Sequence, residues 1–320
     1  MSKVENYVTQ VEINANQNVK SNHPIAAVGV RFSKSIDIIR RGVKAVGVTA
    51  PKTVFIAAIS SDIGGRLVEL YLDAGYRVIG TFRQRQHVRH LETRAEVHLI
   101  HCDIGNDRDL ETVSSYFSEN GFIWDHFISA VGQLSPIGKF VEVPARDWKK
   151  SVMVNSLQQL ELLHYLTPYR RPEDGAKVAF LVGGAINRAF ANYSAYSLGK
   201  VMLVKFCELI SDETPDLHCV AIGTGWVASK IHDQTLAAGE AAGDNLSATR
   251  AFIEGNETGT PIEDIFALIN WCFARPETAG RNFSVVHDDW RDGGAALSAS
   301  LRRDEDMFRL RRSGNQHKSD

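Results

Sequence analysis

The sequence predicts an α/β fold in which helices cover both faces of a doubly wound parallel sheet of about seven strands. From residue 51 onward, short apolar runs alternate with longer segments of helical periodicity, which is typical of βαβ units. The runs are rich in β-branched residues and are too short to favour helices. The chain has 320 residues, 44% of them apolar, so it is long enough to bury the core of one such domain.

The expected strands and helices follow one another in the order that this fold requires. The first strand is expected at 54–58, and the helix after it carries Ile63, Leu67 and Leu70 on one face before Gly75 ends it. Further strands are expected at 77–81, 97–102, 127–131, 177–182, 217–222 and 283–286. Long helices are expected at 148–166 and 196–211, and a mostly helical region at 226–275.

The same pattern sets the domain boundaries. Residues 51–290 are predicted to form a single main domain, because the alternation of strand and helix patterns begins and ends there. Residues 1–50 are predicted to be an N-terminal extension, and residues 291–320 a charged C-terminal tail.

The composition argues against several kinds of partner. The 36 basic and 38 acidic residues give a formal net charge of −2, so the chain has no global field to hold a nucleic acid. The four cysteines form no CxxC pair, and we expect reduced thiols and no metal site. No apolar run reaches the roughly 18 residues of a membrane span, and no secretory signal is present. We therefore expect a cytoplasmic protein without a membrane partner.

Residues 57–64 join the first strand to a helix through a tight turn. Ser60, Ser61 or Asp62 can cap this helix, whose free amides and positive dipole end can bind a pyrophosphate. An ordinary strand-to-helix connection has the same appearance, so both interpretations stay open for the turn alone.

A tyrosine and a lysine stand four positions apart in the helix expected at 196–211. This spacing puts the Tyr196 phenol and the Lys200 ammonium on one helix face. Because a nearby cation favours the phenolate, Lys200 is expected to lower the pKa of Tyr196 from about 10 toward the working pH. The pair is a candidate for proton transfer, although an unrelated surface pair has the same spacing.

Together these motifs resemble the short-chain dehydrogenase/reductase family, over roughly residues 54–286. The turn at 57–64 is similar to the family's Thr-Gly-x-x-x-Gly-x-Gly motif, and Tyr196 with Lys200 is its Tyr-x-x-x-Lys pair. Asp103 matches an adenine-contacting residue after the third strand, and Asn155 falls at the position of a structural and catalytic asparagine. The resemblance implies a Rossmann-type fold, a nicotinamide dinucleotide and a homodimer or homotetramer.

The resemblance also implies roles for individual residues. Tyr196 would exchange a proton with the substrate oxygen, Lys200 would lower its pKa and hold the nicotinamide ribose, and Asn155 would support a water link toward Lys200. Besides Tyr196 and Lys200, the residues implied to bind the dinucleotide are Ala58, Ser60, Ser61, Asp62, Ile63, Gly64, Asp103, Ile104, Ala130, Val131, Gly132, Gly225 and Val227.

Four positions depart from the family pattern, among them Thr224, which stands where the family usually has proline. Ala58 and Asp62 replace the first two glycines of the turn motif, and a side chain beside a pyrophosphate weakens binding unless it points away. Gly183 stands where the family has its catalytic serine, thirteen residues before the tyrosine. Asn187 and Ser194 are candidate substitutes for that hydroxyl, although a loop-capping asparagine and a helix-entry serine explain them as well.

The end of the second strand favours NADP(H) over NAD(H). A carboxylate there would hold the ribose 2′-hydroxyl of NAD, but Phe82 fills the aligned position, and Arg83 after it can pair with a 2′-phosphate. Solvated loop charges are the alternative interpretation of Arg83 and Arg85.

We therefore expect an NADP(H)-dependent oxidoreductase that moves hydride to or from a carbonyl or alcohol carbon of a small molecule. Residues 280–286 and 310–315 resemble short-chain reductases of bacterial surface-polysaccharide precursors, which implies a phosphorylated or nucleotide-linked sugar with the tail arginines as phosphate partners. A lipid or secondary-metabolite ketone is the alternative substrate. Two other functions stay open: a dinucleotide-binding sensor or scaffold without turnover, and an isomerase or dehydratase that retains its cofactor.

Overall fold

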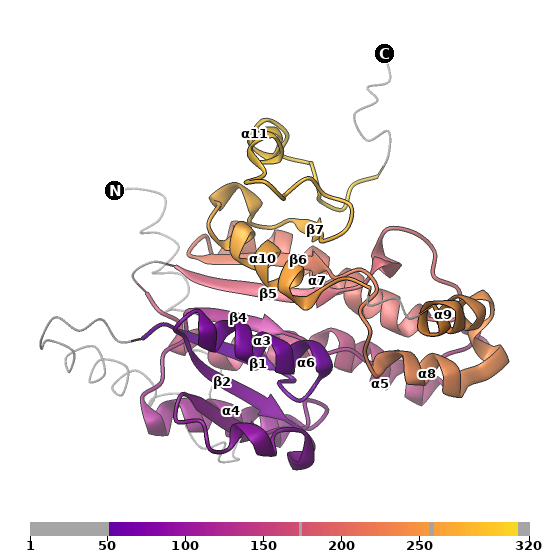
Figure 1. Cartoon of the computed structure of the whole chain (residues 1–320), viewed down its shortest axis with the longest axis horizontal. Helices are drawn as coiled ribbons and strands as arrows, with labels where there is room; N and C mark the ends of the chain where they lie inside the picture. The colour runs from indigo at the N-terminus through magenta and orange to yellow at the C-terminus, as the bar shows by residue number, and fades with distance from the viewer. Residues whose placement is uncertain (1–50, 173–174, 256–258, 313–320) are drawn as a thin grey trace, which may run out of the picture. The chain divides into compact units, whose positions relative to one another are not determined.

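Seven parallel strands form the central sheet (Figure 1). The computed structural model describes residues 51–172, 175–255 and 259–312, and the extension expected at 1–50 lies outside these ranges. The strands are β1 (Thr53–Ala57), β2 (Arg77–Phe82), β3 (Val97–His101), β4 (His126–Ser129), β5 (Ala176–Val182), β6 (Leu217–Gly223) and β7 (Asn282–Ser284). Their order across the sheet is β3-β2-β1-β4-β5-β6-β7, and each neighbouring pair is parallel. The predicted doubly wound Rossmann-type fold is confirmed.

The strand order reverses at β1. This strand pairs with β2 on one side and with β4 on the other, so that Phe55 lies opposite both Ile79 and Phe127. The chain winds outward from β1 in both directions, and the loops after β1 and β4 therefore separate at the carboxyl edge of the sheet. In sheets of this kind a ligand binds in the crevice at that point.

Alternating strand residues give each face of the sheet its own hydrophobic core. On one face, Val54 and Ile56 of β1 pack in a core with helices α3 (Asp62–Asp73), α10 (Ile262–Phe273) and α11 (Ala295–Arg303). On the other face, Phe55 and Ala57 share a core with α4 (Asp107–Asn120), α5 (Ala145–Asn155), α6 (Leu157–Leu166) and α7 (Ser194–Glu213). The division follows from the period of two with which side chains alternate along a strand.

The remaining elements are shorter. Helices α8 (Ile231–Ala238) and α9 (Asp244–Glu254) follow β6 and pack on each other (Figure 1). Short 3₁₀ helices are η1 (Arg85–His87), η2 (Arg89–Leu91), η3 (Thr167–Tyr169), η4 (Gly184–Ile186), η5 (Gly239–Ala242) and η6 (Pro276–Thr278). Within the described ranges, no helix combines the length and the hydrophobicity that crossing a membrane requires.

The single helix expected at 148–166 is interrupted in the structure. Helix α5 ends at Asn155 and α6 begins at Leu157, because Ser156 between them has non-helical dihedral angles (φ −144°, ψ −85°). At this break the buried Asn155 side chain donates to the carbonyls of Ser151 at 2.9 Å and Gln133 at 2.8 Å. The end of α5 is thereby tied to the loop after β4.

The charged tail expected at 291–320 is folded in its first part. Helix α11 buries Leu297 and Leu301 in the core. The buried Arg281 donates to the carbonyls of Leu301, Asp304 and Met307, so one guanidinium group anchors this segment beside β7. The folded chain therefore extends past the expected boundary at residue 290.

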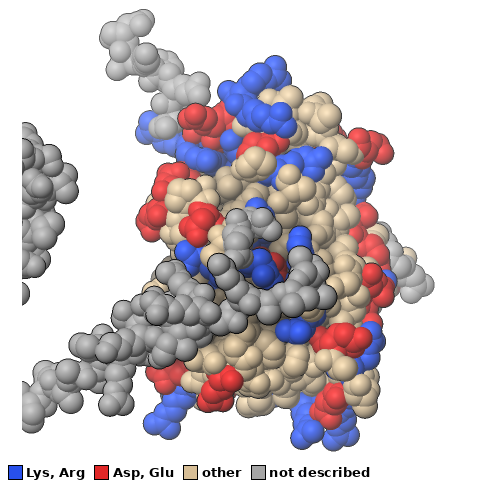
Figure 2. Space-filling view, turned by 90° about the vertical axis from the view of Figure 1, so that its left-hand side faces the viewer, with Lys and Arg blue, Asp and Glu red and all other residues tan. Residues whose placement is uncertain are grey.

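Charged side chains are mixed on the surface. On the face that Figure 2 shows, lysine and arginine lie beside aspartate and glutamate, with no extended area of one sign. Three arginines of the tail form ion pairs: Arg291 contacts Asp264 at 2.8 Å, Arg302 contacts Glu277 at 2.8 Å, and Arg311 contacts Glu208 at 2.7 Å.

Candidate active site

A cavity of about 1090 Å³ opens at the carboxyl edge of the sheet, where the strand order reverses. Its walls come from the turn after β1, the ends of β2 and β3, the loop after β4, α5, the end of β5, α7, the region from β6 to α9, and β7 with the residues after it. All of the residues predicted to bind the dinucleotide line it except Gly64, and so do Tyr196 and Lys200. The predicted catalytic Asn155 does not line it.

The tail arginines expected to meet a substrate phosphate lie elsewhere. No described residue after His287 lines the cavity, so that expectation is wrong. The arginines and lysines that do line it are Arg83, Lys150, Arg188, Lys200 and Lys230.

The turn after β1 keeps a tight backbone although two of its motif glycines are replaced. Ala58 adopts a left-handed conformation (φ 63°), which costs a non-glycine residue roughly 1 kcal/mol. The Ser61 hydroxyl donates to the Ala58 carbonyl at 2.8 Å and accepts from the Gly64 N–H at 3.0 Å, which caps α3. A Cβ on Gly64 would lie 2.3 Å from the Ala58 oxygen, so the close backbone approach requires this glycine.

The first amides of α3 are available to an anion. Among the described residues, no acceptor pairs with the backbone N–H groups of Asp62 and Ile63, which lie at the positive end of the helix dipole. The Asp62 carboxylate is engaged elsewhere, because it accepts from the Lys230 N–H at 2.7 Å and lies 3.5 Å from Lys230 Nζ. The turn therefore fits a phosphate group.

The end of β2 presents one available arginine to the cavity. Arg83 is exposed and has no ion-pair partner within the described chain. Arg85, by contrast, pairs with Glu92 at 2.7 Å and does not line the cavity. After β3, the Asp103 carboxylate accepts from the Gly105 N–H at 3.0 Å, on the cavity wall.

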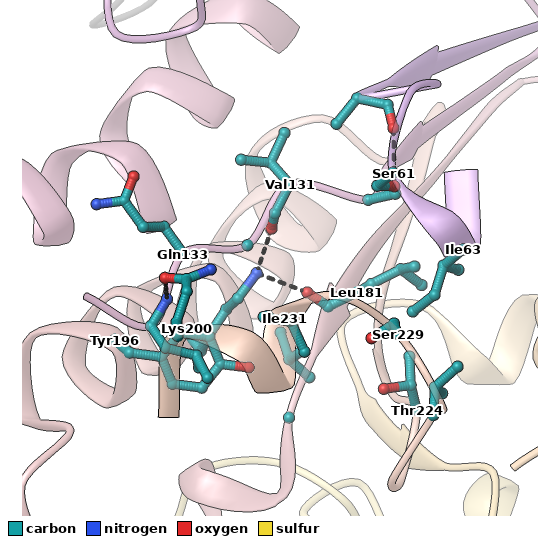
Figure 3. A pocket seen from close by; sticks show the side chains of 18 of the residues that line it. Ser61, Ile63, Val131, Gln133, Leu181, Tyr196, Lys200, Thr224, Ser229 and Ile231 are labelled. Atoms are coloured by element: carbon teal, nitrogen blue, oxygen red, sulfur yellow. Dashed lines mark hydrogen bonds between the residues drawn. The ribbon is translucent and has the colours of Figure 1, made fainter. Parts of the chain in front are cut away.

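Helix α7 carries the two principal catalytic candidates into the cavity (Figure 3). Lys200 is 2% exposed, and its Nζ donates to the carbonyls of Val131 at 2.7 Å and Leu181 at 2.8 Å. Tyr196 is 9% exposed, and Lys200 Nζ lies 5.8 Å from its ring centroid. Two backbone carbonyls at the carboxyl edge thus hold the ammonium beside the phenol ring.

Burial controls the ionisation of both side chains. It raises the pKa of Tyr196 to about 12 and lowers the pKa of Lys200 to about 7. The expectation that Lys200 lowers the Tyr196 pKa is therefore wrong, because desolvation dominates and the ammonium is directed at two carbonyls. A phenol with a raised pKa stays protonated at neutral pH, so Tyr196 carries a proton that it can donate.

Gly183 brings the end of β5 against the Tyr196 hydroxyl. A Cβ built on Gly183 would lie 2.6 Å from Tyr196 Oη, which is too close for a real contact. The hydroxyl therefore occupies space that a serine side chain would need. Of the two candidate substitutes, Ser194 accepts from Trp148 Nε1 at 2.9 Å and does not line the cavity, whereas Asn187 does.

Asn155 acts on the loop after β4. Its Oδ1 accepts from the Gln133 N–H at 3.0 Å while its Nδ2 donates to the Gln133 carbonyl, so both ends of the amide hold one residue. The same loop carries Val131, whose carbonyl accepts from Lys200. These bonds give Asn155 a positioning role, and its water link toward Lys200 stays a prediction.

The segment after β6 reaches the cavity through a second required glycine. Gly225 has a left-handed φ of 71°, and a Cβ there would lie 2.4 Å from Thr260 Oγ1 and 2.6 Å from Val286 Cγ2. Thr224 and Val227 on either side of it also line the cavity.

Helix α8 supplies wall residues without a sequence motif. Gln234 Oε1 accepts from two backbone N–H groups of the loop after β4, each at 3.0 Å, and Thr235 Oγ1 lies 2.9 Å from Tyr193 Oη. Tyr193 had a usable signal, because it stands only three positions before Tyr196; it directly precedes α7, and both tyrosines line the cavity. Gln234 and Thr235 had none, since their partners lie far away in the sequence.

The sequence is similar to known proteins over part of its length. Residues 57–263, more than half of the chain, match the family model described as Enoyl-(Acyl carrier protein) reductase. An uncharacterized oxidoreductase of Schizosaccharomyces pombe is 29% identical over 103 residues, which cover 32% of this chain. That match spans 41% of the relative's own length.

Solved structures of similar fold cover most of the described chain. A short-chain dehydrogenase/reductase of Saccharomyces cerevisiae has a TM-score of 0.68 at 19% identity, with 75% of this chain and 98% of that one covered. Aldohexose dehydrogenase of Thermoplasma acidophilum has a TM-score of 0.62 at 17% identity, with 77% and 94% covered. At these low sequence identities, the similarity to the two structures shows a shared fold. Because the family model matches most of the region that builds the sheet and the cavity, the chain belongs to the short-chain dehydrogenase/reductase family of NAD(P)-dependent oxidoreductases.

Proposed function

We propose that the protein is an NADP(H)-dependent oxidoreductase that moves hydride to or from a carbonyl or alcohol carbon. The observation that carries this proposal is the shared cavity, which joins the free amides of Asp62 and Ile63 to the buried pair of Tyr196 and Lys200. When bound there, NADP(H) supplies or accepts the hydride. The residues of the chain bind and orient both reactants and move the proton.

Tyr196 is the proposed proton donor to the substrate oxygen in the direction of reduction. Because burial raises its pKa to about 12, the phenol carries its proton when a carbonyl oxygen gains negative charge. As an ammonium, Lys200 has three N–H donors, of which Val131 and Leu181 take two. The third remains for a ribose hydroxyl of the dinucleotide. Asn187 is the proposed second donor to the substrate oxygen, in place of the serine that Gly183 replaces.

The preference for NADP(H) rests on Arg83. Its guanidinium lines the cavity without a carboxylate partner among the described residues, and such a group can bind a phosphate through two hydrogen bonds. Phe82, at the end of β2, cannot hold a ribose 2′-hydroxyl as the acidic residue of an NAD site does.

The proposed substrate is a small anionic molecule, such as a phosphorylated or nucleotide-linked sugar. Lys150 of α5 and Arg188 of the segment between β5 and α7 line the cavity, and both are exposed without an ion-pair partner in the described chain. The carboxylates on the cavity wall, Asp62 and Asp103, belong instead to the dinucleotide end. A negatively charged group near Tyr196 would therefore meet cations and no acidic side chain.

A homodimer or homotetramer in the cytoplasm completes the proposal. Leu157, Leu198 and Leu209 on α6 and α7 are 41%, 48% and 48% exposed, and a subunit contact would bury them. The four cysteines are buried thiols without a disulfide, as is usual in a reducing compartment.

Binding of the two dinucleotides tests the cofactor. We expect NADPH to bind at least about tenfold more tightly than NADH, because of the extra charge-assisted bonds to the 2′-phosphate, when each is titrated by fluorescence. Arg83→Met should abolish this preference, whereas the matched variant Arg85→Met should keep it, because Glu92 already holds that side chain. Equal affinities in the unaltered protein would contradict the proposed preference.

Consumption of NADPH tests the reaction. The protein is incubated with separate pools of sugar phosphates, nucleotide sugars, neutral sugars and apolar ketones while the absorbance of the reduced nicotinamide is followed. We expect consumption with the anionic sugars. Consumption with apolar ketones alone would overturn the substrate class. Binding without any consumption would favour a sensor, or an isomerase whose product would be found by analysis of the pools.

A further inference from the structure

The first residue of α3 carries a carboxylate that reaches the segment between β6 and α8. Asp62 Oδ2 accepts from the Lys230 N–H at 2.7 Å, and Asp62 Oδ1 lies 3.5 Å from Lys230 Nζ. The two residues are 168 positions apart in the sequence, and both line the cavity. Asp62 thus joins the turn after β1 to the start of α8.

This carboxylate lies near the amino ends of two helices. Asp62 is in the first turn of α3, and Lys230 directly precedes α8. A carboxylate is favourable at the positive end of a helix dipole. However, it also competes with any phosphate that uses the amides of Asp62 and Ile63, because like charges repel each other.

Lys230 reduces the repulsion between the Asp62 carboxylate and a bound phosphate. Its ammonium offsets the Asp62 charge, and its side chain, 67% exposed, is on the cavity wall. An ion pair this exposed contributes little by itself. The hydrogen bond from the Lys230 backbone to the carboxylate is charge-assisted and fixes the main chain. Asp62 therefore determines where the Lys230 ammonium stands.

Helix α8 has other attachments as well, of which two lie nearer its middle. Gln234 accepts from the loop after β4, and Thr235 bonds to Tyr193 at the start of α7. Its amino end is attached to the dinucleotide turn through Asp62. We propose that Asp62 and Lys230 form a charge-compensated clasp, which anchors the amino end of α8 to this turn and positions the Lys230 ammonium toward the dinucleotide phosphates. This inference rests on the proposed dinucleotide site.

A double-mutant cycle tests the charge compensation. NADPH is titrated by fluorescence against the full chain and against Lys230→Met, Asp62→Gly and the double variant. Lys230→Met leaves the carboxylate uncompensated beside a phosphate, so we expect affinity to fall about tenfold. In the Asp62→Gly background the same change should cost no more than about twofold, because no carboxylate remains to be offset.

Hydrogen exchange in the protein without cofactor tests the anchor separately. Asp62→Gly should raise amide exchange over residues 229–234 several-fold, because the Lys230 N–H loses its acceptor. Asp62→Asn should keep most of the protection, since an amide oxygen also accepts this hydrogen bond. Lys139→Met is the matched control: it breaks an exposed pair with Glu142 at 3.2 Å outside the cavity and should change neither affinity nor exchange.

Two results would overturn the clasp. An equal loss of NADPH affinity from Lys230→Met in both backgrounds would show that the lysine acts independently of Asp62. Unchanged exchange over residues 229–234 in Asp62→Gly would show that the carboxylate does not anchor α8. Absence of NADPH and NADH binding to the unaltered protein would instead contradict the proposed function, and with it the role of the clasp in binding.

Discussion

Buried titratable side chains lie at both edges of the sheet, but only those at the carboxyl edge line the cavity. At the carboxyl edge, Tyr196 and Lys200 line the cavity. At the amino edge, His126 and His218 lie at the starts of β4 and β6, outside that cavity, and His218 Nε2 is 2.9 Å from Thr278 Oγ1. Burial lowers the pKa of each histidine to about 3, as it shifts the pKa values at the other edge. A perturbed pKa thus indicates function only where a ligand can reach the group.

Tyr196→Phe should have the largest effect, because it removes the proton that the carboxyl edge is proposed to supply. We expect turnover to fall about 10²- to 10⁴-fold, which is the usual contribution of a general acid. NADPH affinity should change little, since the ring remains. Turnover and fluorescence titration measure the two effects. Tyr116→Phe on α4, outside the cavity, should alter neither. Undiminished turnover in Tyr196→Phe would remove this residue from the mechanism.

Below pH about 6.5, acid should act mainly on the amino edge, because Lys200 at the other edge, with a pKa of about 7, has by then largely gained its proton. An unfolded histidine has a pKa of about 6.5, whereas those of folded His126 and His218 lie at about 3. Below pH about 6.5 the unfolded chain therefore binds protons that the folded chain does not. The stability that the neutral His126 and His218 contribute is fully present above this pH and is lost progressively as the pH falls toward 3. The free energy of unfolding should fall by a few kcal/mol over this range.

The melting temperature measured from about pH 7.5 to pH 5 checks this direction, because most carboxylates stay ionised in that window. Substituting His126 and His218 together by glutamine should flatten the profile. A melting temperature that stays constant or rises on acidification of the unaltered protein would contradict the assignment of neutral buried histidines.

Substitutions of Gly183 test what this position contributes to turnover: room for the Tyr196 phenol, or the lack of a serine hydroxyl. Gly183→Ala and Gly183→Ser add the same Cβ, which would lie 2.6 Å from Tyr196 Oη, and both should displace the phenol. We expect both to lower turnover about tenfold, because misplacing a reacting group by a fraction of an ångström is costly. A serine variant that exceeds both the alanine variant and the unaltered protein would show that the hydroxyl itself is what the site lacks.

The smallest effect is expected at the turn after β1. Ala58→Gly relieves a left-handed alanine (φ 63°), so we expect the free energy of unfolding to rise by about 1 kcal/mol or less. Ala74→Gly is the matched control, because Ala74 has φ −80° and gains nothing from glycine. Urea unfolding compares the two. Destabilisation of the same size in both would show that Ala58 is not strained.

Most of the fold could be predicted because its signals are local. The strand expected at 177–182 is Ala176–Val182, and its neighbours are found within a few residues of their predicted limits. Helix α4 had local signals too, although no element was predicted there. Asn106 caps it by accepting from the Arg108 N–H, and Gly121 ends it with a left-handed φ of 62°.

In the site, only the residues that belong to local sequence motifs could be predicted. Tyr196 and Lys200 share one helix, so their spacing was sufficient to pair them. The partner of Asp62 lies 168 positions away, and no local pattern reveals that its charge is compensated. The direction of the Tyr196 pKa was predicted wrongly for the same reason, since burial depends on packing from several distant elements.

The path of the hydrogen tests the central proposal most directly. NADPH that carries deuterium at the transferable position of the nicotinamide is incubated with the protein and a substrate found by the consumption assay. We predict one deuterium on the carbon that becomes the alcohol carbon, lost from the cofactor in equal amount. Product formed without this label, while the cofactor keeps its deuterium, would contradict hydride transfer.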